Sequence, residues 1–93
     1  MKFMVTWQMH PGKLHDTLAK FAQMTPEQDA ALAGKHVTLI GRWHDLARAR
    51  GVAIFESDSA AAFSKYALAW NGFMDLDVSV VLDDAETRAQ GRG

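Results

Sequence analysis

Histidine, arginine and acidic side chains near strand ends are the residues of this chain that could do chemistry. The densest group lies in GRWHDL, residues 41–46, where Arg42, His44 and Asp45 stand close together. A histidine titrates near neutral pH and can act as a general base when a carboxylate such as Glu56 orients it. An arginine can hold an anionic or phenolic ligand, but a structural ion pair explains the same residue. The group is therefore either a reactive site or a strand end whose polar groups reach water.

The histidine spacing does not suit a metal site. His10, His15, His36 and His44 show neither the HxH nor the HxxxH pattern that places two ligands on one face. His36 and His44 share strand parity, but the extended chain between them spans about 26 Å. Cysteine is absent, so the chain has neither a thiolate ligand nor a disulfide. No metal and no cofactor are expected.

Length and composition predict one domain over residues 1–85 and a disordered tail over 86–93. The chain has 93 residues, of which 48% are hydrophobic, and a net charge of -1. Without a basic stripe, nucleic-acid binding is not expected. No apolar run is long enough to cross a membrane, and the N-terminus lacks the features of a signal peptide. The expected location is the cytoplasm.

Alternation and capping signals predict the elements that position these residues. Residues 2–10 alternate as a strand, and an amphipathic helix with Leu14, Leu18 and Phe21 on one side follows. A capping box at Thr25–Gln28 opens a short helix that ends near residue 34. Strands are predicted at 36–44, 51–57 and 74–82, with a helix capped by Ser57 or Asp58 before the last strand.

This order, β-α-β-β-α-β with the short extra helix, predicts an α+β, ferredoxin-like fold. Its four-stranded antiparallel sheet carries helices on one face only, and the bare face needs a partner. Strand alternation turns Trp43 toward the helices. The first and third strands are expected to be parallel neighbours, which would bring His10 beside Glu56 as a catalytic pair. The ligand contacts expected on the bare face are Thr6, Gln8, Arg42, His44 and Ile54.

Several segments also resemble a known family. They are the start KFMVTW, the strand end LIGRWHD, the junction FESDSA and the late strand DLDVSVVLDD, spread over about residues 2–85. They are similar to a small bacterial family of unknown function in the dimeric α/β-barrel superfamily. The resemblance implies a homodimer whose two sheets form a barrel. Haem-degrading members of this superfamily use a histidine late in the chain. No histidine follows His44 here, so the resemblance does not extend to haem chemistry.

Two functions remain open from the sequence. The first is a homodimer that binds a small apolar or aromatic molecule in the barrel, with cofactor-free chemistry such as cyclisation, isomerisation or oxygenation. The second is a non-catalytic dimerisation module. A cavity of roughly 300 Å³ or more favours the first, and an interior filled with side chains favours the second.

Overall fold

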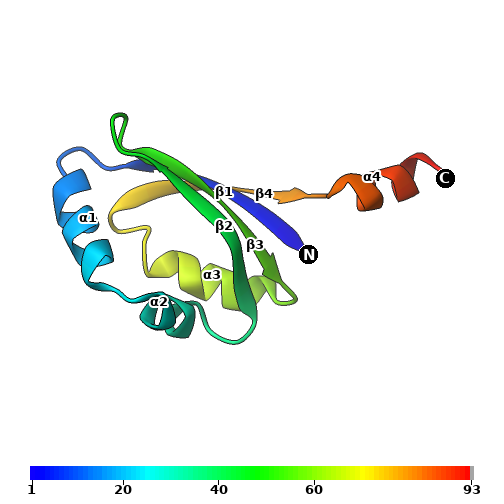
Figure 1. Ribbon diagram of the computed structural model, residues 1–93, viewed down its shortest axis with the longest axis horizontal. Helices are drawn as coiled ribbons and strands as arrows, with labels where there is room; N and C mark the ends of the chain where they lie inside the picture. The colour runs from blue at the N-terminus through cyan, green and yellow to red at the C-terminus, as the bar shows by residue number, and fades with distance from the viewer. Residues whose placement is uncertain (93) are drawn as a thin grey trace.

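Eight elements follow one another in the computed structural model, which describes residues 1–92. They are β1 (Lys2–Met9), α1 (Leu14–Gln23), α2 (Pro26–Ala33), β2 (Val37–Asp45), β3 (Arg50–Ser57), α3 (Ala60–Leu68), β4 (Met74–Val81) and α4 (Asp84–Gly91). The strands form one antiparallel sheet in the order β2-β3-β1-β4. Helices α1, α2 and α3 lie on one side of this sheet (Figure 1). The predicted α+β ferredoxin-like fold is confirmed.

Local sequence signals explain where two of the helices begin. The amide of Gln28 donates to the Thr25 hydroxyl over 3.1 Å, and the Gln28 side chain accepts from the Thr25 amide over 2.9 Å. This confirms the capping box that opens α2. Helix α3 is capped by Ser59, which accepts from the amide of Ala62. The prediction of Ser57 or Asp58 as its cap was wrong, because the Ser57 hydroxyl instead bonds the backbone of Ser59.

The core lies between the sheet and α3. Phe3 of β1 stacks on Phe63 of α3 with ring centroids 4.6 Å apart, and Phe55 of β3 meets the same ring edge-on. Helix cover does not reach the far end of β4, where Val78 and Val80 remain 42% and 61% exposed. The helix-facing side of the sheet is therefore buried at its centre and open at its β4 edge.

The direction of β3 differs from the prediction. It runs antiparallel to β1, with Lys2 opposite Glu56 and Gln8 opposite Arg50. Glu56 therefore lies beside the start of β1, whereas His10 follows its end. The expected neighbourhood of His10 and Glu56 was wrong, because it depended on parallel strands.

A β-bulge in β2 reverses which side chains face the helices. Leu39 pairs with Phe55 and Gly41 with Ile54, so Ile40 is an extra residue without a partner. Side chains after a one-residue insertion change sides of the sheet. Trp43 therefore lies on the open face and is 60% exposed, although the alternation predicted it in the core.

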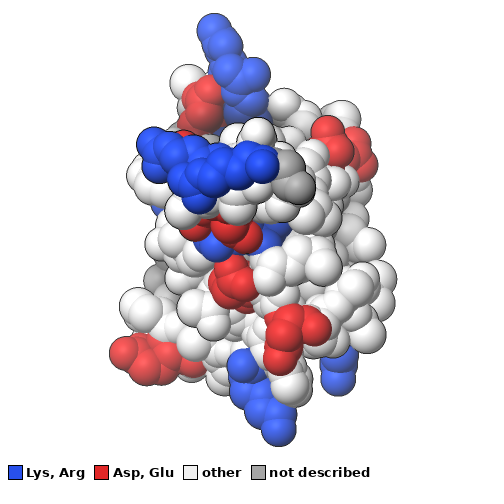
Figure 2. Space-filling view, turned by 90° about the vertical axis from the view of Figure 1, so that its right-hand side faces the viewer, with Lys and Arg blue, Asp and Glu red and all other residues white. Residues whose placement is uncertain are grey.

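Helix α4 occupies residues for which a disordered tail was expected. Asp83 and Glu86 form a second capping box, and Lys2 contacts Glu86 over 3.0 Å. Residue 93 lies outside the described part of the chain. Helix α4 projects away from the sheet (Figure 1), and the surface at this end carries interspersed charges of both signs (Figure 2). Within residues 1–92, no helix has the length and apolar character needed to span a membrane.

Candidate functional site

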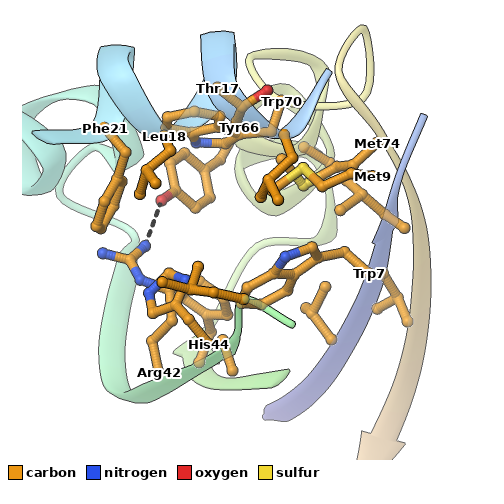
Figure 3. Close-up of a pocket in the computed structure, with 18 of the residues that line it drawn as sticks. Trp7, Met9, Thr17, Leu18, Phe21, Arg42, His44, Tyr66, Trp70 and Met74 are labelled. Atoms are coloured by element: carbon orange, nitrogen blue, oxygen red, sulfur yellow. Dashed lines mark hydrogen bonds between the residues drawn. The ribbon is translucent and has the colours of Figure 1, made fainter. Parts of the chain in front are cut away.

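An apolar pocket opens between the helix-facing side of the sheet and helices α1 and α3 (Figure 3). Its volume is about 90 Å³, below the ~300 Å³ typical of sites for drug-sized ligands. Most of its walls are aromatic and aliphatic, and its polar side chains come from three elements. The residues that line it include Trp7, Met9, Leu14, Thr17, Leu18, Phe21, Arg42, His44, Phe55, Phe63, Tyr66, Trp70 and Met74.

A buried polar group closes one side of the pocket. Arg42 of β2 donates to Asp29 of α2 over 2.7 Å, and the Tyr66 hydroxyl of α3 donates to the other Asp29 oxygen over 2.9 Å. The Arg42 guanidinium also lies 4.8 Å from the Phe21 ring centre and 3.5 Å from the Tyr66 hydroxyl. Asp29 and Tyr66 are 7% and 5% exposed. Burial, and then the Asp29 carboxylate, raise the pKa of Tyr66, so this hydroxyl stays protonated as a donor.

His44 stands at the mouth of the pocket as a neutral base. Its ring packs edge-on against Trp7, with centroids 5.6 Å apart, and lies 5.2 Å from Phe21. Partial burial, and then the charge of Arg42, lower its pKa below the ordinary value of 6.5. The lowered pKa favours the neutral imidazole at neutral pH, and in this form the ring can accept a proton.

Thr17 is the remaining polar side chain of the pocket. It lies on the inner side of α1, is 3% exposed, and its hydroxyl has no hydrogen-bond partner among residues 1–92. Because buried polar groups are nearly always paired, an unpaired hydroxyl beside a cavity needs an explanation.

The bulge at Ile40 is the reason that Arg42 and His44 belong to this pocket. After the bulge, Arg42 pairs with Ala53 and His44 with Gly51, two positions on the helix-facing side. Gly51 is required here, because a Cβ at this position would collide with the Trp7 ring. The bulge and this glycine together let the Trp7 and His44 rings pack side by side.

The other predicted site residues lie outside this pocket. Thr6, Gln8, Ile54 and Glu56 share the opposite parity of β1 and β3 and belong to the open face. Glu56 accepts from the N-terminal ammonium, which is the main reason that its pKa is lowered.

His10 binds Asp75 over 2.9 Å, in a separate hollow near Gln8 and His15. Among residues 1–92, no three His, Cys, Asp or Glu side chains converge as a metal site would require.

Sequence reasoning missed two members of the buried group. Asp29 follows a helix start, where an acidic residue is explained by the helix dipole alone. Tyr66 lies on the apolar stripe of α3, where an aromatic residue is explained by packing alone. One signal was available for the bulge, since an isolated glycine such as Gly41 inside a strand is typical of such irregularities.

A family model described as a domain of unknown function, DUF3303, matches residues 1–92. No curated protein matches the chain.

Proposed function

The chain belongs to the DUF3303 family, whose function is unknown, and we propose that its helix-side pocket binds a small aromatic molecule. The observation that carries the proposal is the composition of the pocket, in which aromatic walls adjoin the partly exposed imidazole of His44, whose pKa is lowered. Binding sites for small molecules are mostly apolar with a few placed polar groups. The pocket has this character on the side of the sheet opposite to the one predicted.

The size of the pocket supports a ligand of about one ring. Engineered cavities of about 150 Å³ hold benzene, and the volume here is about 90 Å³. A one-ring compound, or the ring of a larger molecule, therefore needs only a small outward movement of the wall. Leu18 of α1, 37% exposed, stands at this wall beside solvent.

The charges of the pocket support an uncharged ligand. The Arg42 guanidinium is already matched by the Asp29 carboxylate over 2.7 Å. An anionic ligand would leave one unmatched negative charge in a half-buried site, which is unfavourable. The ligand is therefore neutral when it binds.

The chemistry that suits these groups is proton transfer without a cofactor. His44 takes a proton from an acidic O–H or C–H of the bound molecule, and the nearby guanidinium of Arg42 stabilises the oxygen anion that forms. Such a step begins an isomerisation or a cyclisation. With dioxygen as a second substrate, it also begins an oxygenation.

We also propose that a second copy of the chain covers the open face. Trp43 is 60% exposed there and pairs with Val52, in a patch that includes Met4 and Ile54. The Trp43 ring lies flat on Gly41, where a Cβ would come within 2.5 Å of it. An exposed apolar patch with a flat aromatic residue is typical of a homodimer interface.

The alternative function, a dimerisation module without a ligand, is favoured by the small volume of the pocket. One measurement distinguishes the two functions. It is the binding of toluene, phenol and indole, detected by tryptophan fluorescence and by calorimetry. Saturable binding is expected for the natural chain and for Ala61→Leu, which changes the outer side of α3. Ala67→Leu fills the pocket from the same helix and should abolish it. Equal behaviour of the two variants, or no binding by the natural chain, would leave only the dimerisation module.

A further inference from the structure

Helices α1 and α2 are attached to the molecule in different ways. Helix α2 is fixed by Asp29, which binds both Arg42 and Tyr66. Within residues 1–92, by contrast, no hydrogen bond or ion pair joins a side chain of α1 to another element. Helix α1 is held by apolar contacts across the pocket and by two contacts of cations with rings: Arg42 lies 4.8 Å from the Phe21 ring centre, and Lys20 lies 4.8 Å from the Phe73 ring centre. Such contacts tolerate movement better than a buried ion pair does.

Both ends of α1 can act as hinges. Gly12 precedes it with a φ of 77°, and glycine adopts a wider range of backbone angles than any other residue. No side chain caps its first turn at Lys13. At its other end, Met24 is extended and leads into the capped start of α2. Movement of α1 therefore need not disturb α2.

The unpaired hydroxyl of Thr17 biases this movement. When α1 lies against the sheet, that hydroxyl loses contact with water and gains no partner. An unpaired buried hydroxyl opposes the closed position of the helix. A bound molecule that offers an oxygen to Thr17 removes this opposition.

We propose that α1 is a lid on the pocket, and that an aromatic ligand bearing a hydroxyl or carbonyl oxygen closes it by a hydrogen bond to Thr17. The proposal rests on the function proposed above and narrows its ligand from apolar aromatics to oxygen-bearing ones. It also explains how a pocket too small for a ring admits one. The open position gives entry, and the ligand oxygen selects the closed position.

Hydrogen exchange of backbone amides in the ligand-free protein tests the lid. Amides in the last turns of α1 should exchange faster than those of α3, because they open locally. Thr17→Val removes the unpaired hydroxyl without changing the shape, and should slow exchange in α1 by roughly tenfold. Thr6→Val makes the same change on the open face and should leave α1 unaffected. The lid would be refuted if the amides of α1 exchanged at the same rate as those of α3 and if Thr17→Val left that rate unchanged.

Phenol and toluene, which differ by a hydroxyl in place of a methyl group, test the ligand oxygen. At equal occupancy, phenol should slow exchange in α1 several-fold more than toluene does. Thr17→Val should erase this difference, while Thr17→Ser, which keeps the hydroxyl, should retain it.

Equal effects of the two compounds on the natural chain would refute the role of Thr17 and leave the pocket as a binding site. If neither compound bound, the proposed function itself would fail.

Discussion

The two faces of the sheet are built from the same four strands but differ in what they can do. The helix-facing side carries an apolar pocket with the buried pair Arg42 and Asp29 and the neutral base His44. The open side carries the exposed Trp43 and no helix. We propose the first side as the site of a small ligand and the second as the contact with another copy of the chain.

The difference between the faces depends on a single inserted residue. Without the bulge at Ile40, alternation would place Trp43 against the helices and turn Arg42 and His44 outward. One residue thus decides which side chains of β2 face the helices and which lie on the open side. Four predictions test this division, from the largest expected effect to the smallest.

Removing the buried ion pair should have the largest effect. Arg42→Ala leaves the Asp29 carboxylate buried without its charged partner, which should lower the free energy of unfolding by about 3–5 kcal/mol. Urea unfolding measures this change. Arg88→Ala, at an exposed pair on α4, should stay within about 0.5 kcal/mol. A similar small loss for both variants would mean that the pair does not support the pocket.

Adding one methyl group under the pocket should have the next largest effect. Gly51→Ala places a Cβ against the Trp7 ring and the carbonyl of Trp43, and should cost about 1–3 kcal/mol through overpacking. Gly72→Ala meets open space and is the control. Thermal unfolding of the two variants compares them. A stable Gly51→Ala chain would show that the rings of the pocket wall can repack.

Changing the open face should affect assembly without affecting the fold. Trp43→Ser should weaken the dimer by about tenfold or more, since truncation of a central aromatic residue commonly costs over 1 kcal/mol of binding energy. Leu68→Ser alters an equally exposed apolar residue on α3, at 69% exposure, and should not change association. Analytical ultracentrifugation reports both. A natural chain that remains a single subunit at micromolar concentration would contradict the dimer.

The smallest effect concerns pH. The pKa of His44 is lowered in the folded chain from 6.5, so the unfolded chain binds a proton in a range where the folded chain does not. The free energy of unfolding should therefore fall as pH drops below about 6.5 and level off below the folded pKa. Titration of the His44 ring by nuclear magnetic resonance measures that pKa. A His44 pKa at or above 6.5 would contradict the assignment of this residue as a neutral base.

Some features of the fold and the site could be predicted from the sequence, and others could not. The capping box at Thr25 and the alternation of β1 depend on neighbouring residues, so they were predictable. The site was less predictable, because a bulge has only a weak local signal in Gly41 and moves every later side chain of β2 to the other face. The contact of Asp29 with Arg42 and Tyr66 joins three separate elements, and no local sequence pattern predicts it.

The most direct test of the division between the faces is to locate a bound ring. Nuclear Overhauser contacts between toluene protons and the protein should appear at Trp70, Met74 and His44, which line the pocket. Contacts only at Trp43 and Ile54 would place the ligand on the open face and contradict the account.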